Sequence, residues 1–317
     1  MDTLLIMLKN VIIFVLLAVP GYLLVKGKLL TTRDTGVLSK LLTYVGLPAM
    51  ILSSTLKLSF TGEFTMTMVF TALLGAGLIL GGVALTGLVV KDPDAKRRGM
   101  LRFCIAFPNN GLIGIPLAQA VFGADSPVMA YLIVLNIINN VLAFTLGAYL
   151  VSGDKKDMQL KKALLNPVLL AFFAGIGLNL LKVPAFLPEL QTYAGHFGGI
   201  VTALSMLVLG IKLAEVPMGR IFTAWRMYYV SFMRLVLLPV LCVGVLLALQ
   251  LIPALGISAD MIVGFFVAFA MPTAGLASAF ADQYKGDTEN AVICTLGCTV
   301  LSVAVMPVLY WLLCLIV

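Results

Sequence analysis

Prolines and asparagines interrupt a long apolar segment near residue 110. Residues 106–117 read AFPNNGLIGIPL and contain Pro108, Asn109, Asn110 and Gly111. Proline lacks a backbone N–H and clashes with the carbonyl one turn earlier, so a helix is expected to break or kink here. Inside a membrane, a break is tolerated only where protein or a water-filled cavity satisfies the freed polar groups. This break is therefore the first candidate binding site.

A second segment with the same features follows about half a chain later. Residues 268–280 read AFAMPTAGLASAF and contain Pro272, Thr273 and Ala274. Two interrupted apolar segments at corresponding places in two halves of a chain are typical of a transporter's binding site. One break alone is explained equally well by a proline kink whose freed carbonyls are satisfied by asparagines. Two breaks in register favour the binding site.

The chemistry expected at two such breaks is anion binding. Half-helices that begin near Asn110–Gly111 and Thr273–Ala274 would direct unpaired N–H groups and positive dipole ends at their meeting point. That arrangement binds an anion without a formal charge. The amides of Asn109 and Asn110 and the hydroxyl of Thr273 would add polar contacts.

Further polar residues lie inside apolar segments. Asn136 and Asn140 are four residues apart and share a helix face, where they either line the substrate path or hold helices together. Ser54 and Ser205 are weaker candidates, because a serine hydroxyl can bond to its own helix backbone.

Two charged residues accompany the breaks. Arg234 lies within an apolar segment, where a charge must snorkel to the surface, pair, or meet water or substrate. We expect it to have a structural or gating role. Asp282 is the carboxylate near the second break, and we assign it the same type of role. The sequence contains no cluster of buried carboxylates, so no metal site and no cofactor is predicted; the coupling ion, H⁺ or Na⁺, is open.

The composition is that of a membrane protein. Of 317 residues, 61% are hydrophobic and 11% charged, and the mean hydropathy is +1.10, which excludes an ordinary soluble domain. Apolar runs of about 20 residues predict an all-α polytopic fold with ten transmembrane helices. The expected spans are Leu4–Val25, Val37–Leu56, Phe64–Val90, Gly99–Phe122, Val128–Val151, Leu164–Leu181, Phe197–Lys212, Tyr228–Leu251, Asp260–Gln283 and Asn290–Ile316.

The distribution of charge predicts the orientation. Nearly all lysines and arginines fall in the loops after odd-numbered spans. By the positive-inside rule these loops are cytoplasmic, so both termini face outward and the chain lies in a plasma membrane. The net charge of +7 is explained by this orientation within a lipid bilayer, and no nucleic-acid partner is expected.

The most polar segment, SGDKKDMQLKK, lies near the middle of the chain and divides it. We expect a first five-helix repeat at residues 1–151, a cytoplasmic linker at 152–163 and a second, inverted repeat at 164–317. An enzyme is not expected, since the chain has no HExxH motif, no nucleophile with a credible base and no phosphate-binding glycine loop.

The motif FPNNGLIGIPL resembles the fourth-helix signature of the auxin efflux carrier family, in which a Pro-Asn pair precedes Gly-Ile-Pro. AMPTAGLASAFADQY resembles the partner segment in the ninth helix, and NPVLLAFFAGIGLNLL the start of the second half. Arg234, shortly before Pro239, fits the eighth helix. The long cytoplasmic loop of many plant members is absent, which indicates a compact bacterial-type member in the inner membrane.

This resemblance implies a 5+5 inverted repeat in which a transport domain moves against a scaffold domain, within a homodimer. It also implies an anionic substrate, namely indole-acetate in plants and small carboxylates such as malonate or malate in bacteria. By analogy Asn109 would contact the carboxylate and Asn136 would face the substrate. We therefore expect a transporter of small organic carboxylates that works by elevator-type alternating access. The alternatives are a sodium-coupled carrier of the bile-acid symporter type, a channel and a non-transporting anion sensor.

Overall fold

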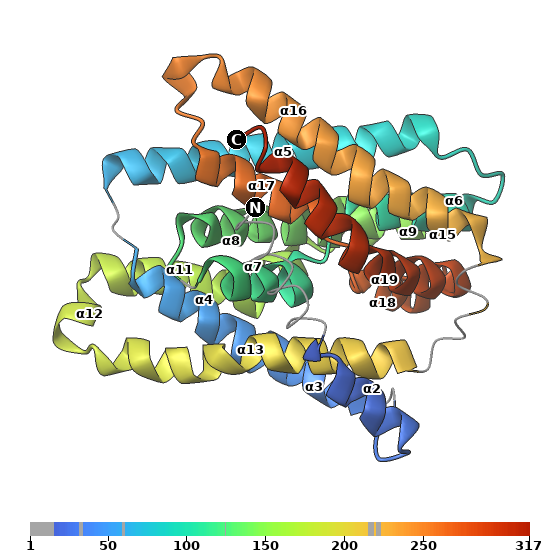
Figure 1. Cartoon of the computed structure of the whole chain (residues 1–317), viewed down its shortest axis with the longest axis horizontal. Helices are drawn as coiled ribbons and strands as arrows, with labels where there is room; N and C mark the ends of the chain where they lie inside the picture. Colours follow the sequence, from blue (N-terminus) through green and yellow to red (C-terminus); the bar gives the residue numbers. More distant parts are fainter. Residues whose placement is uncertain (1–15, 32–33, 59–60, 124, 215–218, 220–222) are drawn as a thin grey trace.

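The computed structural model describes residues 16–31, 34–58, 61–123, 125–214, 219 and 223–317, and every regular element in these ranges is a helix (Figure 1). Within these ranges, seven helical segments are long and apolar enough to cross a membrane: Thr35–Leu56, Gly62–Val89, Pro127–Ser152, Lys155–Leu180, Glu189–Ala214, Trp225–Gln250 and Thr288–Leu313. The expected fourth and ninth spans are each divided into shorter helices. The expected first span, Leu4–Val25, lies partly outside the described residues.

The first break, between α6 and η3, divides the helices of the first half of the chain. Its elements are α2 (Val19–Lys26), α3 (Thr35–Leu41), η2 (Leu42–Gly46), α4 (Leu47–Leu56), α5 (Gly62–Val89), α6 (Ala95–Ala106), η3 (Asn110–Gly114), α7 (Ile115–Phe122), α8 (Pro127–Leu142), η4 (Ala143–Gly147) and α9 (Ala148–Ser152). Side-chain caps fix several starts: Thr61 accepts from the Phe64 N–H, and Ser126 accepts from the Val128 N–H.

The second half follows a short linker. Its elements are η5 (Lys155–Asp157), α10 (Leu160–Leu164), α11 (Pro167–Leu180), α12 (Val183–Phe186), α13 (Glu189–Ala214), α15 (Trp225–Phe232), η6 (Met233–Leu237), α16 (Leu238–Gln250), η7 (Pro253–Leu255), α17 (Ala259–Ala270), α18 (Leu276–Gln283) and α19 (Thr288–Leu313). The helix α13 begins at Glu189, eight residues before the expected start at Phe197, because residues 189–196 continue the same helix.

Three π-helical turns are each followed by a proline. The turns η2, η3 and η6 end at Gly46, Gly114 and Leu237, and a proline follows each two residues later. Since proline cannot donate to the preceding turn, the wider π turn accommodates it without ending the helix. The long helices therefore continue through their prolines, whereas Pro108 and Pro272 interrupt theirs.

The helices pack in two groups. In the first, α13 packs against α2 and α4, and α4 packs against α11; these helices lie together in the lower part of Figure 1. In the second, α8 packs against α5 and α17, α16 packs against α17, α19 packs against α15 and α18, and α6 packs against α9. Both breaks belong to the second group, and each group contains helices from both halves of the chain.

Glycine allows α2 and α13 to touch backbone to backbone. A Cβ built on Gly21 would lie 2.1 Å from the carbonyl oxygen of Leu207, and one built on Gly210 would lie 1.9 Å from that of Ala18. No larger residue fits either position unless the helices separate. Small residues are the usual means of such close approach between membrane helices.

Candidate functional site

The site is built on the two interrupted helices. The helix α6 ends at Ala106 and η3 begins at Asn110, whereas α17 ends at Ala270 and α18 begins at Leu276. The break near residue 110 lies where the sequence predicts it. The start of α18 is two residues later than the expected Thr273–Ala274, because these two residues are extended and pair with the other break.

The two breaks pair with each other through their backbones. Pro108 and Thr273 form an antiparallel bridge, in which the Asn109 N–H donates to the Pro272 carbonyl at 2.8 Å and the Ala274 N–H donates to the Phe107 carbonyl at 2.9 Å. Backbone groups freed in one helix are thus satisfied by the other. This is the condition under which irregular backbone is tolerated at membrane depth.

Arg234 binds the carbonyl ends of both interrupted helices. Its side chain is 0% exposed, and Nε donates to the Met271 carbonyl at 3.1 Å. Nη1 donates to the carbonyls of Ile105 at 2.9 Å and Ala106 at 3.1 Å, and Nη2 donates to that of Phe269. A cation is favoured at helix C-termini, where carbonyls lack intrahelical partners. Because the guanidinium is buried, it does not snorkel, which the sequence had allowed.

Two further side chains hold the breaks in place. The buried Thr273 hydroxyl donates to the Cys104 carbonyl at 2.9 Å, which ties the second break to α6. Asn139 Nδ2 donates to the Pro108 carbonyl at 3.2 Å. Asn139 is not among the site residues predicted from the sequence. Its spacing of three residues from Asn136 is a signal that could have done so, since residues three apart share a helix face.

Asn109 lies between the two breaks. Its Oδ1 accepts from the Leu112 N–H at 3.3 Å, so it caps the helix that begins at Asn110. A Cβ built on Gly275 would lie 3.9 Å from Asn109 Nδ2, which places this amide beside the start of α18. The side chain of Asn109 is half-buried and lies beside both half-helix starts.

Buried amide atoms without partners lie beside the first break. Asn110 and Asn136 are each 1% exposed, and among the described residues Asn110 Oδ1 and Asn136 Nδ2 have no hydrogen-bond partner. Asn136 Oδ1 accepts from Asn140 at 3.4 Å, and it lies 3.5 Å from the position of a Cβ on Gly111. An unsatisfied buried polar atom is costly, so native structures usually have a reason for it, such as an absent ligand or water.

The remaining candidates lie apart from this cluster. The Ser205 hydroxyl donates to the Thr202 carbonyl of its own helix at 3.0 Å. Ser54 is buried in α4, seven residues and thus about two turns after Leu47, whose side chain lies near Gly111. Asp282 is exposed at the end of α18 and accepts from the Thr288 hydroxyl at 3.2 Å. None of the three contacts the bridge in the described structure.

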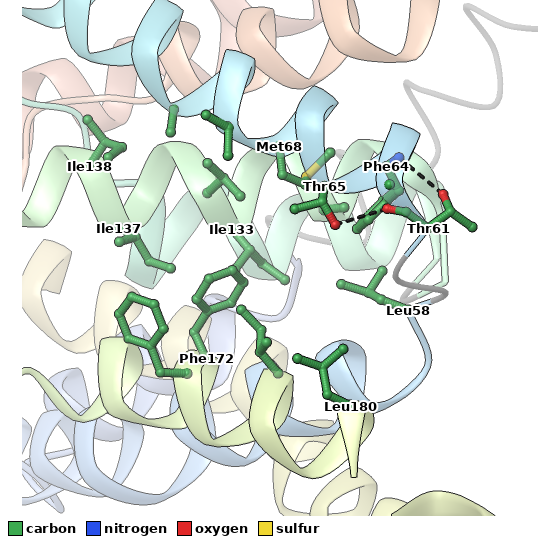
Figure 2. A pocket seen from close by; sticks show the side chains of 17 residues that line it. Leu58, Thr61, Phe64, Thr65, Met68, Ile133, Ile137, Ile138, Phe172 and Leu180 are labelled. Carbon is green, nitrogen blue, oxygen red and sulfur yellow. Dashed lines mark hydrogen bonds between the residues drawn. The ribbon is translucent and has the colours of Figure 1, made fainter. Parts of the chain in front are cut away.

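A large apolar cavity lies at a distance from the breaks. It has a volume of about 520 Å³ between α5, α8 and α11. Figure 2 shows Phe172 and Leu180 on α11 facing Ile133 and Met68 across it. It contains no predicted site residue, and it lies on the boundary between the two groups of helices.

Comparison with known proteins gives the family. Residues 5–311 match the model of the membrane transport protein family, the family of the auxin efflux carriers. An uncharacterized transporter of Methanothermobacter thermautotrophicus is 25% identical over 301 residues, which cover 94% of this chain and 94% of that protein. The resemblance drawn from FPNNGLIGIPL is thereby confirmed. The chain belongs to the membrane transport protein family, and it is a multi-pass transporter of the membrane.

Proposed function

We propose that this transporter carries a small organic carboxylate, of the malonate, malate or auxin-like type, and binds it where the two interrupted helices meet. The observation that carries the proposal is the buried amide donor Asn136 Nδ2, which has no hydrogen-bond partner among the described residues and lies beside a bridge formed by both breaks. A bound carboxylate would accept from Asn136 Nδ2. Asn109, Gly111 and the starts of η3 and α18 would complete the contacts.

The electrostatics of the breaks favour an anion. The starts of η3 and α18 present positive dipole ends, and the dipole of each preceding half-helix is neutralised by Arg234. Among the described residues Arg234 has no carboxylate partner, because its acceptors are carbonyl groups. The positive potential of the starts of η3 and α18 is therefore left at the bridge. A carboxylate at the bridge would compensate it over a short distance of low dielectric.

For the mechanism we propose elevator-type alternating access within a ten-helix, 5+5 inverted repeat. The division at residues 1–151, 152–163 and 164–317 gives each packing group the corresponding helices of both halves. The group of α2, α4, α11 and α13 would be the scaffold domain, and the group that holds the crossing helices would be the transport domain. The apolar cavity between α11 and the pair of α5 and α8 supports a boundary along which the groups slide.

We further propose that the chain lies in a bacterial inner membrane with both termini on the extracytoplasmic side, as the charge distribution predicts, and that it forms a homodimer. A coupling ion, H⁺ or Na⁺, belongs to the same proposal. A sodium-coupled carrier of the bile-acid type would need oxygen ligands beside the breaks, and here these would have to be backbone carbonyls. Sodium dependence of transport distinguishes this alternative.

The decisive test is Asn109→Ala in liposomes that contain the purified transporter. Counterflow of labelled malonate and malate is expected in the parent protein and is expected to fall at least tenfold in the variant, with an unchanged elution profile. Asn290→Ala is the matched control, since Asn290 bonds to Asp287 at the start of α19, away from the breaks. Normal counterflow by Asn109→Ala would contradict the site. Binding without counterflow in the parent would favour a sensor, and flux without counterflow a channel.

A further inference from the structure

A polar cavity lies between the end of α5 and the start of α6, at the opposite end of α6 from the first break. Its volume is about 450 Å³, and it is lined by Gly87, Val90, Lys91, Asp92, Pro93 and Arg98. The absence of a side chain at Gly87 keeps it open. A Cβ built there would lie 3.2 Å from Nη2 of Arg102, so this guanidinium borders the same space.

Three cations face this cavity without a carboxylate partner. Lys91 and Arg98 form its wall, and Arg102 Nε donates to the Thr86 hydroxyl at 3.3 Å. Arg98 Nη1 donates to the backbone carbonyl of Asp92 at 2.9 Å. Within the described parts of the chain, none of the three forms an ion pair.

The nearby carboxylates already have hydrogen-bond partners. Asp92 accepts from Arg97 Nε at 2.7 Å and Nη2 at 2.8 Å, and Arg226 Nε lies 3.5 Å from the same carboxylate. Asp94 accepts from the Lys96 and Arg97 backbone N–H groups and so caps α6. Neither carboxylate neutralises the three cations that face the cavity. The cavity thus has the charge that suits a phosphate group.

The neighbouring side chains place this cavity at the level of the lipid headgroups. Trp225 is 64% exposed, with the guanidinium of Arg226 5.2 Å from its ring centre, and the Tyr229 hydroxyl donates to the Val89 carbonyl at 3.0 Å. Tryptophan and tyrosine concentrate at membrane–water interfaces. Leu88, in the last turn of α5, is 70% exposed and faces the surroundings of the protein.

We propose that the cavity of Gly87, Lys91, Arg98 and Arg102 binds the phosphate headgroup of an anionic membrane lipid. Basic pockets between membrane helices are suited to such headgroups, and this one is wide enough and lies at the right depth. The acyl chains would extend along the exposed side of α5. The site is independent of the carboxylate site, since it shares no residue with either break.

The test measures lipid retention by native mass spectrometry and thermal unfolding of the purified transporter in detergent. Phosphatidylglycerol is expected to bind and to raise the unfolding temperature, whereas phosphatidylcholine is not. In the double variant Arg98→Gln/Arg102→Gln, affinity for phosphatidylglycerol is expected to fall about 30-fold, since each basic residue contributes about fivefold. The matched control is Lys155→Gln/Lys156→Gln, in which two exposed cations of η5 are removed.

A second variant tests whether binding needs the open volume of the cavity as well as its charge. Gly87→Leu fills the cavity and leaves the net charge unchanged, so it is also expected to weaken phosphatidylglycerol binding. Stabilisation of the parent by inorganic phosphate alone, to the same extent as by the lipid, would overturn the lipid assignment. Equal lipid affinity in the double variant and the parent, or an equal loss in the lysine control, would overturn the site.

Discussion

The break after α6 and the break after α17 share a backbone arrangement but carry different side chains. Asparagines cap, support and surround the first break, where Asn109 caps η3 and Asn139 binds the Pro108 carbonyl. The second break, MPTAG, carries one hydrogen-bonding side chain, the Thr273 hydroxyl, which donates to α6. Under the proposed function, the first break would supply the amides that recognise a ligand, and the second would supply backbone groups.

The largest effect is expected from the one residue that both breaks share. Arg234→Met would leave four carbonyl groups without their donor, and each unsatisfied buried group costs about 1–3 kcal/mol. We expect a loss of at least about 3 kcal/mol in the free energy of unfolding, measured by denaturant titration in detergent. Arg234→Lys keeps the charge with fewer and less rigid donors, so it should fall between parent and Arg234→Met. A parent-like Arg234→Met would show that the breaks hold without this cation.

The next comparison separates recognition from support within the first break. Asn136→Ala removes a donor, Nδ2, that has no partner among the described residues, and one long hydrogen bond of 3.4 Å from Asn140. Transport should therefore fall about tenfold with little change in stability. Asn139→Ala removes the bond to Pro108 and should lower the free energy of unfolding by about 1–2 kcal/mol. Counterflow and unfolding are measured on both variants. The assignment fails if Asn139→Ala loses transport while Asn136→Ala retains it.

A smaller effect tests the second break. Thr273→Val keeps the shape of the side chain but removes the donor to Cys104, which should cost about 1 kcal/mol of stability. Since this hydroxyl is engaged in the fold, the apparent substrate affinity should change less than in Asn109→Ala. A loss of affinity as large as that of Asn109→Ala would make the two breaks equal partners in recognition.

The smallest effect is expected in the charged loop between α5 and α6, which is not part of either break. The hydrogen bond from Arg97 lowers the pKa of Asp92, so the folded state binds this proton less readily than the unfolded state. The contribution of Asp92 to the free energy of unfolding is fully present above its unfolded pKa of about 4. It is lost as the pH falls through the lower pKa of the folded state. Between pH 6 and pH 3, the free energy of unfolding of Asp92→Asn should therefore fall less with decreasing pH than that of the parent protein. The bonds of Arg234 to carbonyl groups should not contribute to it.

Both breaks could be predicted from the sequence because a polar residue directly follows each proline, in PNNG and PTAG. An apolar residue follows each proline that comes after a π turn, and there the helix continues. The partners of Arg234 could not be predicted, since they are carbonyl groups at positions 129 and 37 residues away, and a carbonyl leaves no mark in the residue type. The start of α18 was misplaced for a related reason, because the pairing of Thr273 with Pro108 connects distant segments. Asn139 could not be singled out because its role depends on a contact with Pro108, 31 residues earlier in the chain. The four-residue spacing favoured Asn136 and Asn140 instead.

The close contact of α2 with α13 has a consequence for the order in which the chain folds. Gly21 meets Leu207, and Gly210 meets Ala18, so each helix completes the other's surface. About 190 residues separate the two glycines, and at about 5–20 residues per second a ribosome needs about 10–40 s to add them. During that time α2 lacks α13 as a packing partner. The final placement of α2 therefore follows the synthesis of α13.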